Sequence, residues 1–199
     1  MSRGMMGRSD EELMLNYREG DEAAFEMLYR KYEKPVLDFI YRMVMSADEA
    51  ENLCQETFFR VVRARKNYQV TATFKTWLFQ IALNLCRDRR RRMKHRSHLS
   101  FSAPVRAQND RDVELQDALA DPSLDLVRRI ETAELGALVQ RAVAALPEDE
   151  HLVVVMKEYQ GLEFSEIAEI MDCPVGTLKS LNHRAHEKLR KTLAKYLGD

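Results

Sequence analysis

The stretch 74–96 constrains the fold more than any other, because it joins an apolar helical stripe to a run of positive charge. Apolar residues recur there at spacings of three and four, which predicts an amphipathic helix with one buried face. They are Phe74, Trp77, Leu78, Ile81, Ala82 and Leu85. Cations follow at positions 87, 89–92, 94 and 96, and only Asp88 opposes them. Such a helix is suited to a polyanion whose bases stack near its aromatic end. A purely structural role on the buried stripe is the alternative for Phe74 and Trp77.

Local signals for the ends of helices are clear in the first part of the chain. Ser9 can cap a helix, with Glu12 as its capping-box partner. Gly20 breaks this helix and Asp21 can cap the next one, in which Pro35 is expected to produce a kink. These signals predict two successive helices before residue 46.

Helical periodicity continues on both sides of one long interruption, and no strand-like alternation occurs. Further helices are predicted at about 48–64, at 131–146 (or from Leu124), and at 148–159, 164–171 and 175–196. From about 98 to 125 the periodicity is lost and acidic residues predominate, which indicates an interdomain linker, either a disordered tether or an acidic strand that occupies a basic channel. We therefore predict an all-α protein with two helical domains, 9–97 and 131–199, joined by a flexible linker at 98–130.

The composition of the 199 residues is that of a soluble globular protein, with 32% charged residues and a net charge of −1. No apolar run can cross a bilayer and the stretch 1–12 resembles no signal peptide, so we expect a cytoplasmic protein without membrane insertion. Cys54, Cys86 and Cys173 lie far apart, and no metal-ligand spacing occurs. Catalytic constellations and glycine-rich phosphate loops are also lacking. We expect no enzyme activity, no metal and no cofactor.

The C-terminal part has the pattern of a helix-turn-helix motif, in which a short helix, a tight turn and a longer basic helix follow one another. The second helix of such a motif can enter a DNA major groove. Small, polar and basic residues share its outward face: Gly176, Lys179, Ser180, His183 and Arg184. Lysine and arginine can bind phosphates or guanine edges there. A helical hairpin that binds no DNA is the alternative.

One position on this helix departs from the apolar stripe. Asn182 stands where the spacing from Leu178 predicts an apolar residue, while Leu181 falls toward the polar side. Either the helix is rotated so that Leu181 packs, or Asn182 caps a buried polar group. We favour the rotation.

The first domain offers a different kind of nucleic-acid contact. Aromatic and amide side chains in the loop 67–73 and on the following helix can hold unstacked bases while arginines track the backbone. The candidates are Tyr68, Phe74, Trp77, Phe79 and Asn84.

Four motifs, in this order, resemble a known family: DEAAFEMLYRKY, DEAENLCQETFFRV, FKTWLFQIALNLCRD and LEFSEIAEIMDCPVGTLKS. They look like conserved regions 2 and 4 of the extracytoplasmic-function (ECF, group IV) sigma factors of bacterial RNA polymerase. The resemblance covers nearly the whole chain apart from the N-terminal tail and the linker. It implies a factor that binds core polymerase and directs initiation at specific promoters.

The resemblance also implies site residues. One helix would dock on the clamp helices of the largest polymerase subunit, through Asp48, Glu51, Asn52, Gln55, Glu56 and Phe59. Other residues would melt the −10 element and trap a flipped base: Tyr68, Phe74, Lys75, Trp77, Asn84, Arg87, Arg90 and Arg91. The −35 duplex would be contacted by Gly176, Thr177, Lys179, Ser180, His183 and Arg184. The polymerase flap and an anti-sigma factor are further implied partners, and the acidic linker would thread toward the polymerase active centre.

Some positions differ from the pattern that is usual in this family. Asn52 stands where an aspartate is common, and Glu163 replaces the usual Ser or Thr cap of a helix. Leu181 and His186 stand where arginines are frequent, and Asn182 stands where an aliphatic residue is frequent. Fewer cations should weaken phosphate anchoring at −35 and lessen its dependence on salt.

Two other functions fit part of the sequence. A stand-alone activator with a C-terminal helix-turn-helix would need an effector domain ahead of it, typically with alternating strands, and no such pattern is present. A helical adaptor that binds only proteins would not need the arginine run or the Lys179 and Arg184 face.

Overall fold

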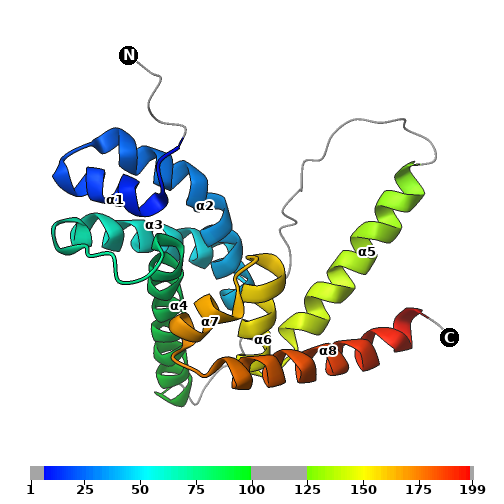
Figure 1. Cartoon of the computed structure of the whole chain (residues 1–199). Coiled ribbons are helices and arrows are strands. Elements are labelled where there is room, and N and C mark those ends of the chain that lie inside the picture. Colours follow the sequence, from blue (N-terminus) through cyan, green and yellow to red (C-terminus); the bar gives the residue numbers. More distant parts are fainter. Residues whose placement is uncertain (1–6, 100–124, 198–199) are drawn as a thin grey trace.

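The computed structural model describes the backbone of residues 7–99 and 125–197, and the side chains of residues 7–93 and 135–194. All regular secondary structure in these ranges is helical, which confirms the all-α prediction (Figure 1). The linker predicted at 98–130 lies mostly outside the described residues, and the proposed domain boundaries remain a prediction.

The first domain contains helices of different lengths, and the longest of them comes last. Its elements are α1 (Asp10–Glu19), α2 (Glu22–Val44), α3 (Ala47–Ala64), the 3₁₀ turn η1 (Arg65–Asn67) and α4 (Phe74–Leu99). Ser9 Oγ accepts a hydrogen bond from Glu12 N at 3.1 Å, and the Glu12 carboxylate accepts from Ser9 N at 2.9 Å. Gly20 ends α1 with φ +115°, a left-handed conformation that glycine adopts without strain. Asp21 then caps α2, so these local predictions are confirmed.

Helix α4 occupies the centre of this domain, where α1, α2 and α3 pack around its first half (Figure 1). Its apolar stripe is fully buried at Phe74, Leu78 and Phe79. The rings of Phe79 and Phe39 meet edge to face, with centroids 5.3 Å apart. Phe79, a candidate for holding a base, is therefore part of the core.

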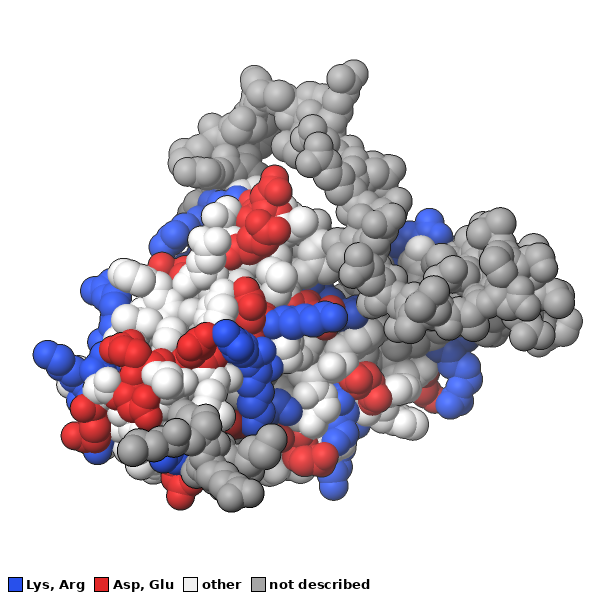
Figure 2. Space-filling view, turned by 90° about the horizontal axis from the view of Figure 1, so that it is seen from above, with Lys and Arg blue, Asp and Glu red and all other residues white. Residues whose placement is uncertain are grey.

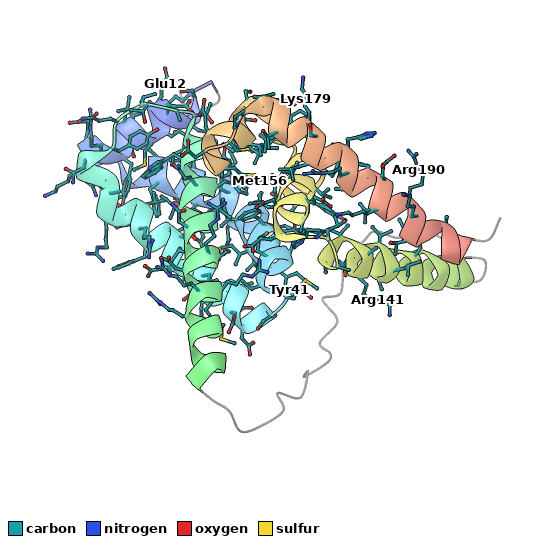
Figure 3. The ribbon with its side chains drawn as sticks, turned by 90° about the horizontal axis from the view of Figure 1, so that it is seen from below. Glu12, Tyr41, Arg141, Met156, Lys179 and Arg190 are labelled. Carbon is teal, nitrogen blue, oxygen red and sulfur yellow. The ribbon has the colours of Figure 1, made fainter. Side chains whose placement is uncertain are left out.

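The second domain contains α5 (Asp125–Ala144), α6 (Glu148–Val154), the π-helical turn η2 (Val155–Tyr159), α7 (Phe164–Met171) and α8 (Val175–Leu197). The prediction of one continuous α-helix at 148–159 is wrong in its last turn. Gln160 N donates to Val155 O at 3.2 Å, which is an i to i+5 bond, so this turn is wider than an α-helical one. Met156 is fully buried between the elements of this region (Figure 3).

The recognition helix of the helix-turn-helix motif, α8, is rotated as the sequence analysis favours. Leu181 is buried with only 8% of its surface exposed, and Leu178 and Ala185 are fully buried beside it. Asn182 is half-buried, and its Oδ1 has no hydrogen-bond partner among the described atoms. The rotation leaves the polar face of α8 directed outward.

The two domains touch each other through α7 against α4 and through η2 against α2. Acidic and basic side chains are interspersed on the face shown in Figure 2, in keeping with a net charge near zero. No helix within the described residues is both long enough and apolar enough to span a membrane.

Candidate nucleic-acid and polymerase-binding surfaces

The loop 68–73 leads into α4 and lies over the aromatic end of that helix. The Tyr68 ring packs against Trp77 with centroids 5.0 Å apart, and Phe74 lies 5.9 Å from the same indole ring. Tyr68 is only 4% exposed, and burial, followed by the negative charges of Glu11 and Asp10, raises its pKa to about 12. Tyr68 and Phe74 are thus buried, while Trp77 keeps part of its ring accessible.

The outer face of α4 presents polar and cationic side chains beyond this aromatic group. Asn84, Arg87 and Arg91 are exposed and share one face of the helix, since they are spaced by three and seven residues. Arg90 is also exposed, and its guanidinium contacts Glu148 of the second domain at 2.8 Å. Together they form a cationic surface that continues from the partly exposed ring of Trp77.

Lys75 lies at the contact between the two domains. Its Nζ donates to the backbone carbonyl of Gln160 at 3.0 Å, and the Gln160 side chain donates to Asp38 at the same distance. The guanidinium of Arg42 stacks on the Tyr159 ring, 3.6 Å from its centroid. Tyr159 is the last residue of the π-helical turn and Gln160 follows it, so the widened turn contributes to this contact beside the packing of α7 against α4.

His151 of α6 is close to the same contact and lines a small pocket with Tyr41 and Arg42 (Tyr41 is labelled in Figure 3). Burial lowers the pKa of His151, and the positive charges of Arg90 and Arg42 lower it further, while Glu148 acts in the opposite direction. The native structure therefore favours the neutral imidazole.

Acid is expected to destabilise the native chain through His151. The folded pKa of His151 lies below its unfolded value. The contribution of the neutral His151 side chain to stability is therefore fully present above about pH 6.5 and is lost as the pH falls through the folded pKa. We expect the unfolding free energy to drop more in the native chain than in His151→Gln between about pH 7.5 and about pH 5.5. Urea unfolding at several pH values measures this. His183→Gln, at an exposed histidine, is the matched control, and equal slopes for the native chain and His151→Gln would refute the prediction.

Helix α8 presents the predicted DNA-contact residues on one surface. Lys179 and Arg190 project from the side of α8 that faces away from α5, whereas Arg141 projects from α5 (Figure 3). All of the predicted −35 residues are exposed: Gly176, Thr177, Lys179, Ser180, His183 and Arg184. Glycine at the start of the helix leaves open space, because a Cβ built on Gly176 would meet no atom within 4 Å. This surface has the shape and chemistry of a groove-binding helix.

Glu150 was missed in the sequence because it resembles an ordinary acid in the first turn of a helix. It is only 5% exposed, and both its oxygens accept hydrogen bonds from Lys188 Nζ at 2.8 Å. Arg184 Nε lies 3.7 Å from the same carboxylate. Its position three and four residues before Val153 and Val154, on their buried side of α6, is the only sequence signal for its burial. Glu150 joins α6 to the recognition helix.

Helix α3 presents the predicted polymerase-binding residues on its solvent side. Asp48, Glu51, Asn52 and Gln55 are exposed, and Glu56 is partly exposed and paired with Arg60 at 3.0 Å. Phe59 adds an apolar ring that is 54% exposed. An acidic and polar face with one exposed aromatic is suited to docking on basic helices.

Two family models match the chain. The Sigma-70 region 2 model matches residues 28–96, and the Sigma-70 region 4 model matches residues 137–189. The chain is 34% identical to the RNA polymerase sigma-H factor of Pseudomonas aeruginosa, with 96% of each protein covered. It is 31% identical to the ECF RNA polymerase sigma-E factor of Escherichia coli K12, with 91% of the chain and 92% of the relative covered.

Two solved structures share the fold. The sigma factor RpoE of Bartonella quintana, in complex with the anti-sigma factor NepR, superposes with a TM-score of 0.64 at 21% identity, covering 85% of this chain and 96% of that one. CnrH, in complex with the cytosolic domain of CnrY, superposes with a TM-score of 0.66 at 19% identity, covering 94% and 99%.

The fold and its exposed helix-turn-helix define a helical transcription factor. More particularly, the chain belongs to the ECF sigma factors of the sigma-70 family, with regions 2 and 4. It directs transcription initiation and is not an enzyme, as the resemblance in the sequence predicts. The family assignment therefore argues against the two alternative functions, a stand-alone transcriptional activator and an adaptor that binds only proteins.

Proposed function

We propose that this sigma factor reads its promoters with two separate surfaces. The 68–73 loop and α4 would open the −10 element and hold a non-template base, and α8 would bind the −35 element as duplex. The exposed row of Asn84, Arg87 and Arg91 supports the first assignment, since single strands are bound by aromatic surfaces flanked by cations. The exposed Lys179 and Arg184 on α8 support the second.

The outer face of α3 would dock on the clamp helices of the largest polymerase subunit, and the second domain would meet the flap. Acidic groups and the exposed Phe59 support this docking. A role in initiation also implies that the protein acts in the cytoplasm, where polymerase and DNA are found. The acidic linker at 98–130 would thread toward the active centre of the polymerase.

An anti-sigma factor would control the chain. A relative of the same fold is described in complex with an anti-sigma factor, although its 21% identity carries only the fold. The α3 face, the DNA-contact face of α8 and the Asn84, Arg87 and Arg91 row of α4 are exposed, so one protein that covered them would block both polymerase binding and promoter binding.

The observation that carries the proposal is the presence of two exposed cationic surfaces on different domains, one beside aromatic rings and one on a helix-turn-helix. Transcription by reconstituted holoenzyme tests it, on a promoter found by start-site mapping with this chain. Scrambling the −35 should abolish the contribution of α8, while scrambling the −10 should abolish transcription. Initiation that ignored both elements would refute the assignment.

A further inference from the structure

Helix α1 fixes both ends of the loop that precedes α4. Glu11 Oε1 accepts a hydrogen bond from Phe74 N at 2.7 Å, where the loop ends and α4 begins. Arg18 donates from its guanidinium to the Tyr68 carbonyl at 3.2 Å, where the loop starts. Glu11 and Arg18 are seven residues apart and so lie on the same face of α1, which faces the loop.

The bond from Glu11 compensates for a local deficiency of α4. Thr73 Oγ1 caps the third residue of the helix by accepting from Thr76 N at 3.1 Å. The N–H of Phe74 has no partner within its own helix, as for every first-turn residue, and Phe74 is fully buried. A carboxylate supplied from α1 satisfies this donor and also suits the positive end of the helix dipole.

Helix α1 is itself held rigidly, so it can serve as a support. The Asp10 carboxylate accepts hydrogen bonds from Tyr32 Oη and Lys31 Nζ on α2. Arg65 of η1 lies over the Tyr17 ring, 4.5 Å from its centroid, and pairs with Glu22 at 2.8 Å. These contacts connect α1 to α2 and to η1, the turn that precedes the loop.

We infer that Glu11 and Arg18 are positioning residues for capture of the −10 strand, because they set the shape of the loop 68–73 against Trp77. The inference rests on the proposed function of this loop. Helix α1 lies before residue 28, where the match to the region 2 model begins, so the support comes from outside the matched segment. Neither residue needs to touch DNA to act in this way.

The test uses full-length chain with core polymerase on a duplex promoter fragment found by start-site mapping. We expect Glu11→Ala and Arg18→Ala each to slow formation of the open complex by about tenfold, the size of losing one hydrogen bond to a charged group. Affinity for core polymerase should stay unchanged, which a general loss of folding would not allow. Glu11→Gln keeps an acceptor oxygen but loses the charge, so its rate should lie between those of the native chain and Glu11→Ala.

Glu26→Ala, which removes an exposed carboxylate on α2 that contacts Arg30, is the matched control. Trp77 is the only tryptophan of the chain, so its fluorescence reports any change in the loop before DNA is added. If Glu11→Ala does not fold, Arg18→Ala carries the test, since Arg18 makes its bond from a side chain that is 36% exposed.

Asn84→Ala separates failure of this inference from failure of the proposed function. Native open-complex rates for Glu11→Ala and Arg18→Ala, alongside a slow Asn84→Ala, would overturn the inference and leave the −10 assignment intact. Native rates for all three would overturn the −10 assignment and the inference with it.

Discussion

Replacing Gln55 and Glu56 together by alanine is expected to weaken binding to core polymerase by about tenfold to a hundredfold, as for residues near the centre of an interface. Both side chains lie on the accessible face of α3, and the core of that helix is formed by other residues, such as Cys54 and Phe58. The domain should therefore stay folded. Size-exclusion co-elution and a fluorescence titration with core polymerase measure the effect.

The double variant Glu26→Ala with Arg30→Ala is the matched control, because it also replaces two solvent-accessible polar side chains of one helix, on α2 instead of α3. It should bind polymerase like the native chain. If the Gln55 and Glu56 variant keeps its circular dichroism spectrum and also keeps its polymerase affinity, the docking face has been assigned wrongly.

Replacing Lys179 and Arg184 by alanine is expected to reduce transcription selectively at promoters with a strong −35 element. Loss of an arginine that reads a base edge costs about 1–3 kcal/mol, and loss of a phosphate contact lowers the salt slope of binding by about one. Holoenzyme affinity for a −35 duplex at several salt concentrations measures both effects. Arg141→Ala with Arg30→Ala removes the same charge from other surfaces and should change neither.

Templates that carry only a −10 element supply the decisive comparison for this variant. The native chain and the Lys179 and Arg184 variant should initiate equally on them, because α8 has no duplex element to bind there. An equal loss on both kinds of template would mean that these cations do not read the −35 element.

Local sequence signals were sufficient to predict the helix ends that depend only on neighbouring residues. The capping box of Ser9 and Glu12, the break at Gly20 and the cap at Asp21 each act within a few residues and appear as predicted. The burial of Leu181 could also be predicted from the sequence. Asn182 stands at a position of the apolar stripe and Leu181 lies beside it, which indicates the direction in which the helix is rotated.

Features that depend on tertiary contacts could not be predicted from the sequence. The bond between Glu11 and Phe74 joins residues 63 apart, so no periodicity reports it. The π-helical turn at Val155 follows a run of valines that fits an α-helix equally well, and the contact of Gln160 with the first domain lies where the widened turn ends. Likewise, the exposure of Trp77 relative to Tyr68 depends on how the loop folds over both rings.

The buried carboxylate of Glu150 contacts two cations, and only one of them forms hydrogen bonds with it. Lys188 makes two bonds at 2.8 Å, whereas Arg184 stands off at 3.7 Å, beyond hydrogen-bonding distance. On the proposed −35 role of Arg184, moving its guanidinium to a phosphate would leave the Glu150 carboxylate paired with Lys188, so no unpaired charge would remain inside the domain. We therefore expect Arg184 to exchange Glu150 for a DNA phosphate without destabilising the second domain.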